Sequence, residues 1–140
     1  MLSAPLVMLL KPAGLARAAA SAASLFAFAI AIAMTIGVLD GSTYTYRMGG
    51  WPAPYGIELS VDRFSALLLL IVTGASTFAL LAGRRSVDAD IDESRQPLFY
   101  AAWLLALAGL SGIPVAADAF NIFVFMEISS LASYVIIAGG

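Results

Sequence analysis

Four long apolar segments dominate the hydrophobic pattern of the chain. They cover residues 18–39, 64–82, 98–117 and 119–140. Each is about 20 residues long, the length that an α-helix needs to cross the hydrocarbon core of a bilayer. Residues 1–10 are also apolar but too short to span, so we interpret them as the end of a truncated helix. The pattern predicts an all-α, polytopic transmembrane helix bundle in one partial membrane domain, residues 1–140.

The charged residues between these segments predict how the helices are oriented. Residues 11–17 contain Lys11 and Arg17, and residues 83–97 contain three arginines. Short loops rich in lysine and arginine stay cytoplasmic, so both loops are predicted to be cytoplasmic and the two other connections extracytoplasmic. A secretory signal peptide is a weaker alternative for the N-terminus, because the apolar run after Arg17 is too long for one.

The first extracytoplasmic connection predicts a short β-hairpin between the second and third helices. Residues 43–46 are β-branched or aromatic, and residues 57–61 alternate between apolar and polar types, with glycines and prolines between the two runs. This is the pattern of two strands joined by a long turn. The aromatic residues of the connection are expected to form an interfacial belt: Tyr44, Tyr46, Trp51 and Tyr55.

Helix ends are also marked in the sequence. Asp62 and Asp118 each precede an apolar segment and are expected to cap helix N-termini with their side-chain oxygens. Pro97 lies where a helix begins and its missing N–H is harmless. Pro114 is expected to end the third long segment after Gly112, because proline disrupts a helix interior. The last two helices therefore form a close hairpin.

Composition supports the membrane class and limits the chemistry. The chain is 61% hydrophobic and 11% charged, with a mean hydropathy of +0.95, whereas soluble domains have about 25% charged residues. It contains no cysteine and no histidine, and its net charge is −2. Thiolate metal sites and histidine proton shuttles are excluded, and no basic patch suggests nucleic acid. Cofactors and bound metals are not expected.

Glu127 is the candidate functional residue, because a charged side chain deep in a membrane helix is usually functional. It lies about 13 Å along the predicted last helix. Ser130 and Tyr134, at i+3 and i+7, share its face and are expected to support it. A buried carboxylate favours its neutral form and can load and release protons. Glu127 could instead be a structural partner of a neighbouring helix. Ser129 and Ser133, on an adjacent stripe, are expected to pack closely against another helix.

Two long motifs carry a family resemblance. GGWPAPYGIELSVDRFSALLLL, residues 49–70, is followed by ADAFNIFVFMEISSLASYVIIAGG, residues 117–140. They resemble the antiporter-like membrane subunits of Mrp-type cation/proton antiporters, respiratory complex I and membrane-bound hydrogenases, and the first motif is most similar to the Mrp D subunit. The resemblance implies a longer family fold with two inverted five-helix repeats, of which this chain matches the N-terminal part.

The resemblance also implies a role for Glu127. It matches the family's glutamate on the fifth helix, which takes part in proton translocation and pairs with a lysine on a later helix, outside this chain. We therefore expect proton translocation in a subunit of an Mrp-type antiporter, with other membrane subunits, lipid, protons and, as a further candidate, Na⁺ as partners. Two alternatives stay open: a proton-pumping subunit of an NADH:quinone oxidoreductase or hydrogenase, and a truncated subunit with a structural or assembly role. Whether the chain serves an enzyme is thus left open.

Overall fold

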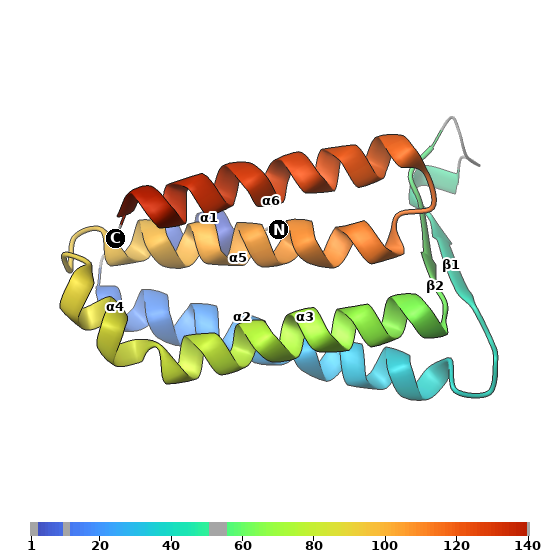
Figure 1. Cartoon of the computed structure of the whole chain (residues 1–140), viewed down its shortest axis with the longest axis horizontal. Coiled ribbons are helices and arrows are strands. Elements are labelled where there is room, and N and C mark those ends of the chain that lie inside the picture. The colour runs from blue at the N-terminus through green and yellow to red at the C-terminus, as the bar shows by residue number, and fades with distance from the viewer. Residues whose placement is uncertain (1–2, 10–11, 51–55, 140) are drawn as a thin grey trace.

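A computed structural model describes residues 3–9, 12–50 and 56–139. The main chain forms a helical bundle with one small antiparallel hairpin, which confirms the predicted fold class (Figure 1). Four of the described helices are long and apolar enough to cross a membrane. The elements are α1 (Ser3–Met8), α2 (Ala13–Gly37), β1 (Tyr44–Arg47), η1 (Met48–Gly50), β2 (Glu58–Val61), α3 (Arg63–Ala82), α4 (Arg84–Asp90), α5 (Gln96–Gly112), η2 (Ile113–Val115) and α6 (Ala119–Gly139).

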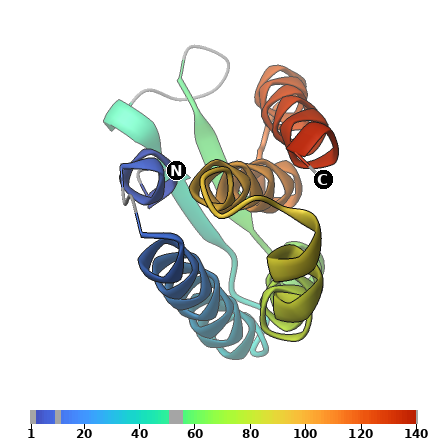
Figure 2. The same ribbon diagram turned by 90° about the vertical axis from the view of Figure 1, so that its left-hand side faces the viewer.

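Helix α5 lies at the centre of the bundle. Viewed along the helices, it is surrounded by α1, α2, α3 and α6 (Figure 2). Half of its most apolar stretch is buried within the chain, against 11% for α6. The largest cluster of buried side chains joins α5 to α1, α2 and α3, and its members are Ala4, Val7, Ala16, Ala20, Leu80, Tyr100 and Leu104. Helix α6 is thus a peripheral helix, and its main contact among the long helices is with α5.

Two features of the helices differ from the sequence pattern. Helix α2 begins at Ala13, five residues before the predicted segment, because Ala13 and Ala16 are buried while Arg17 reaches outward to α4. The predicted loop 83–97 contains the short helix α4. An ion pair between Arg84 and Asp88, one turn apart, supports this helix, with 3.8 Å between Nε and Oδ2.

The connections alternate between the two ends of the bundle. Helix α4 and the beginning of α2 lie at one end, and the hairpin and η2 lie at the other (Figure 1). This arrangement agrees with the predicted sidedness of loops 11–17 and 83–97, although which end is cytoplasmic stays a prediction. Lys11, Trp51 and Tyr55 lie outside the described residues.

The predicted caps form as expected. The Asp62 carboxylate accepts a 2.7 Å hydrogen bond from the Ser65 amide, and Asp118 accepts one of 2.9 Å from the Asn121 amide. These amide donors hold the pKa of both carboxyls below the ordinary value of 3.8. Helix α5 ends at Gly112, just before Pro114, and continues as η2.

The hairpin is fastened to the bundle on its β2 side. Tyr44 pairs with Val61 and Tyr46 pairs with Leu59 across the two strands. The Ala117 amide donates a 3.0 Å hydrogen bond to the Glu58 carbonyl, so β2 is held by the α5–α6 connection. A two-stranded hairpin is only marginally stable alone, and this attachment supplies the neighbouring element that it needs.

Candidate functional site

The residues predicted to form the site share one face of α6. Glu127, Ser130 and Tyr134 are all exposed in this chain, and Tyr134 is 67% exposed. The expected burial of Glu127 is therefore not met within the described residues: its face points away from α5. No ion pair of the described residues includes Glu127. The helix brings the carboxylate and two hydroxyl groups to one surface, and leaves that surface open.

The opposite face of α6 packs tightly on α5. A Cβ atom placed on Gly109 would lie 2.7 Å from the Ser129 amide nitrogen and 2.8 Å from the Phe125 carbonyl oxygen. The two backbones touch at this glycine. The Ser129 and Ser133 hydroxyls each donate a 2.8 Å hydrogen bond to a carbonyl of α6 itself. The predicted close packing is therefore present at Ser129, and it directs Glu127 outward.

A polar cluster that the sequence analysis missed joins three of the long helices. The Ser24 hydroxyl lies 2.9 Å from the Thr77 hydroxyl and 3.4 Å from the Ser76 hydroxyl. The Trp103 indole N–H donates a 2.9 Å hydrogen bond to Ser76, which adds α5 to α2 and α3. The only local signal is the spacing of Thr73 and Thr77, four residues apart on one helix face. Every polar group of this cluster has a hydrogen-bond partner, so the cluster holds the three helices together. We call it the helix clamp.

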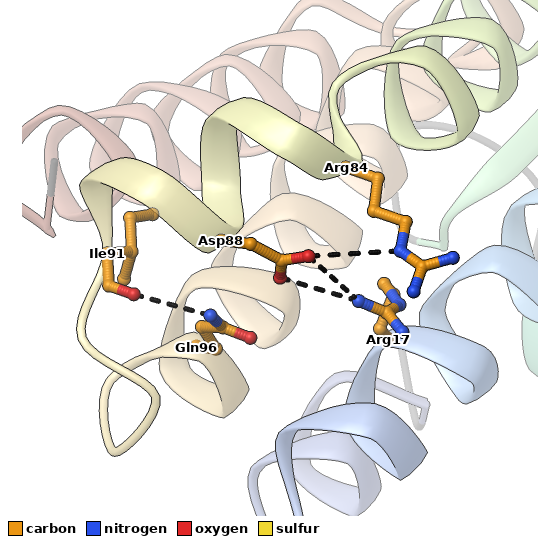
Figure 3. A network of polar contacts seen from close by, with 5 residues as sticks. All are labelled: Arg17, Arg84, Asp88, Ile91 and Gln96. Atoms are coloured by element: carbon orange, nitrogen blue, oxygen red, sulfur yellow. Dashed lines mark hydrogen bonds and ion pairs between the residues drawn. The ribbon is translucent and has the colours of Figure 1, made fainter.

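A second missed cluster lies at the α4 end of the bundle (Figure 3). The Asp88 carboxylate lies between two guanidinium groups, 3.4 Å from Arg17 and 3.8 Å from Arg84. The Gln96 side-chain amide donates a 3.3 Å hydrogen bond to the Ile91 carbonyl. Asp88, in the predicted loop 83–97, thus ties α4 to α2. Within the described ranges, no group of three or more acidic side chains is arranged to hold a metal ion.

Comparisons with known proteins give a consistent picture, although no family model matches the chain. It is 41% identical over 100 residues to the N subunit of the NADH-quinone oxidoreductase of Desulforudis audaxviator, covering 71% of this chain and 20% of that protein. It is 38% identical over 96 residues to the D subunit of the Na⁺/H⁺ antiporter of Bacillus subtilis, covering 69% of this chain and 19% of that protein.

Two solved structures share the fold. One is the membrane-bound sulfane sulfur reductase, an archaeal respiratory membrane complex, with a TM-score of 0.85 and 29% identity over 95% of this chain and 27% of the matched chain. The other is the Mrp complex of Dietzia, with a TM-score of 0.81 and 27% identity over 94% of this chain and 24% of the matched chain.

The chain spans about a fifth of the length of these curated relatives and about a quarter of the matched structures. Its four apolar helices and these relatives make it a multi-pass membrane protein. The agreement of sequence, fold and hairpin places the chain in the family of antiporter-like membrane subunits, of the cation/proton antiporter or complex I-like type.

Proposed function

We propose that this chain is part of a proton pathway in a cation/proton antiporter subunit, and that Glu127 carries the proton. One observation supports this most strongly: Glu127 lies near the middle of a 21-residue apolar helix. A charged side chain at such a position costs about 2.5–3.5 kcal/mol on insertion scales. Glu127 does not lie on the face of α6 that packs on α5. A structural role inside this bundle therefore does not explain the carboxylate.

The surroundings of Glu127 suit reversible protonation once the open face of α6 is covered. Ser130 and Tyr134 offer hydroxyl groups that can donate to the charged carboxylate or accept from its protonated form. We propose that other membrane subunits or helices cover this face in the complex, exclude lipid from it and supply a cation near Glu127. The relatives, which are subunits of a Na⁺/H⁺ antiporter and of an NADH-quinone oxidoreductase, support a multi-subunit assembly.

The test is ion-driven proton movement in membrane vesicles that contain the intact complex. Glu127→Gln keeps the size and removes the proton site, and we expect the pH gradient response to added Na⁺ or K⁺ to fall by about tenfold or more. Glu93→Gln, an exposed acid of the α4–α5 connection, is the matched control and keeps full activity. Ser130→Ala and Tyr134→Phe are expected to give smaller losses. Normal flux from a normally assembled Glu127→Gln complex would show a structural or assembly role instead.

A redox-driven proton pump is the second candidate, because one relative at 41% identity is a subunit of an NADH-quinone oxidoreductase. Proton movement measured in the same vesicles distinguishes the antiporter from the redox-driven pump. An antiporter responds to Na⁺ or K⁺ without an electron donor, whereas a redox pump moves protons only when NADH or another donor is oxidised. Glu127→Gln is expected to impair either response, so the ion or donor requirement, and not the variant, distinguishes them.

A further inference from the structure

The helical turn that carries Glu127 contacts α5 at two points. Helix α6 lies along α5 (Figure 1), and the turn in question runs from Phe125 to Ser129, with Glu127 as its middle residue. The first point is Gly109, where an added Cβ would lie 2.7 Å from the Ser129 amide nitrogen and 2.8 Å from the Phe125 carbonyl oxygen. Gly109 therefore sets how closely this turn approaches α5.

The second point is Gly112, about one turn further along α5. An added Cβ there would overlap the Phe125 ring, because the three atoms nearest to it all belong to that ring. The ring thus occupies the space that a side chain at position 112 would take. Gly109 and Gly112 are three residues apart and share one face of α5. The backbone of the turn rests on one glycine and the Phe125 ring rests on the other.

The backbone of Gly112 does not itself require glycine. Its φ of −72° and ψ of −32° are right-handed helical values that any residue adopts. Glycine is less favourable than alanine within a helix, so this residue weakens the end of α5 unless the missing side chain serves a contact. The Phe125 ring is the contact that it serves, and we call this pair the ring seat.

Two contact points fix the rotation of a helix about its own axis, whereas one point leaves the helix free to turn. Successive residues of an α-helix are about 100° apart around the axis, so Glu127 is about 160° from both Phe125 and Ser129 by the shorter way. Its side chain points almost directly away from α5. A rotation of about 20° moves each Cα atom by roughly 0.8 Å, and an error of about 1 Å can slow a reaction on the order of 100-fold.

We propose that Phe125 and Gly112 are positioning residues for proton transfer by Glu127. The ring seat holds the turn at the rotation in which the carboxylate faces the proton pathway. A phenyl ring suits this role because it is rigid and turns about only two side-chain bonds. It exchanges no proton itself, so it acts only through the direction of Glu127. The inference rests on the proposed function, since it needs Glu127 to carry the proton.

The pH dependence of proton flux distinguishes positioning from a merely structural contact. The titratable side chains of α5 and α6 are Tyr100, Glu127 and Tyr134, so Glu127 is the one carboxylate of this helix pair. Tyr100 lies in the buried cluster that joins α5 to α1, α2 and α3, and Tyr134 shares the face of Glu127. A rotated turn changes the distance from the carboxylate to the groups that cover it, and therefore shifts the pH profile. A loss of assembled complex lowers the flux by the same factor at every pH.

The test is the pH profile of ion-driven proton movement in vesicles that contain the intact complex. Gly112→Ala should reduce the flux by about fivefold or more and shift the midpoint of the profile by about half a pH unit or more. Phe125→Leu should shift the profile by less. The double variant should lie closer to the wild type than Gly112→Ala does, because the smaller side chain leaves room for the added methyl group. Gly139→Ala is the matched control, because Gly139 also lies in α6 and an added Cβ there meets nothing within 4 Å.

Three results would overturn the proposal. Unchanged pH profiles in Gly112→Ala and Phe125→Leu, with flux that follows the amount of assembled complex, would mean a purely structural contact. A double variant whose losses are the sum of the single losses would mean that the ring and the glycine act separately. Normal flux in Glu127→Gln would overturn the proposed function and the positioning role together, whereas lost flux in Glu127→Gln with unchanged profiles in the other variants would overturn the positioning role alone. If Gly112→Ala prevents assembly, the Phe125→Leu profile decides, because that change adds no atoms.

Discussion

Replacing Gly109 with alanine tests the contact that sets the direction of Glu127. The new methyl carbon would lie 2.7 Å from the Ser129 amide nitrogen and 2.8 Å from the Phe125 carbonyl oxygen, whereas ordinary van der Waals contact begins near 3.4 Å. Both neighbours are backbone atoms, so no side chain can turn aside. Helices α5 and α6 must separate by roughly 0.7 Å or more at this point.

The expected loss of stability follows from this overlap. Overpacking of a well-filled interior destabilises a protein by about 1–3 kcal/mol. For a cooperative unit of about this size, that lowers the apparent unfolding temperature by roughly 4–12 °C. Alanine has a better helix propensity than glycine by about 1 kcal/mol, which offsets part of the loss, so the lower half of the range is the expected outcome.

Thermal unfolding of the purified protein in detergent measures the effect. Gly14→Ala is the matched control, because Gly14 also lies in a helix and an added Cβ there meets nothing within 4 Å. This control should unfold at the wild-type temperature or above it. Equal unfolding temperatures for Gly109→Ala and Gly14→Ala would refute the close contact, and with it the argument that α5 directs Glu127 outward.

Three further predictions concern polar contacts. Ser24→Ala removes the 2.9 Å bond to Thr77 and should lower the unfolding free energy by about 0.6–1.7 kcal/mol; no change in the unfolding temperature would contradict the clamp. The folded pKa of Asp118 is lowered, so its stabilisation is present above 3.8 and lost as the pH falls below it; Asp118→Asn should flatten this acid dependence in pH-dependent unfolding. A double-mutant cycle on Arg17 and Asp88, 26% and 43% exposed, should give a coupling of at most about 1 kcal/mol that weakens with salt.

The features that the sequence predicted correctly depend on neighbouring residues. The caps at Asp62 and Asp118 bond amides three residues on, and the hairpin joins two short strands of one connection. The missed features depend on distant partners. Asp88 meets Arg17 across 71 positions, and Ser24 meets Thr77 across 53. Apart from the four-residue spacing of Thr73 and Thr77, nothing in the local pattern marks these residues, because each polar side chain is ordinary until the fold supplies its partner.

The α2 boundary shows a different limit of pattern analysis. The charge on Arg17 interrupts the apolar run, and the predicted span therefore begins at residue 18. An arginine is nevertheless a good helix former, and its long side chain can leave the apolar surface. The helix continues through Arg17 because Ala13 and Ala16, on the N-terminal side of it, pack in the buried interior. Hydropathy thus locates the segment in the membrane, while packing decides where the helix begins.

For Glu127, the sequence predicts the neighbours on its face but not the direction of that face. Helix spacing alone places Ser130 and Tyr134 beside it. The direction follows from Gly109, whose lack of a side chain draws Ser129 and not Glu127 onto α5. Two variants can therefore separate the direction of the Glu127 side chain from the chemistry of its carboxylate. In the intact complex, Gly109→Ala should reduce proton flux while the carboxylate is still present, whereas Glu127→Gln should reduce it while the helix contact is intact. A flux that responds to neither would mean that α6 carries no proton.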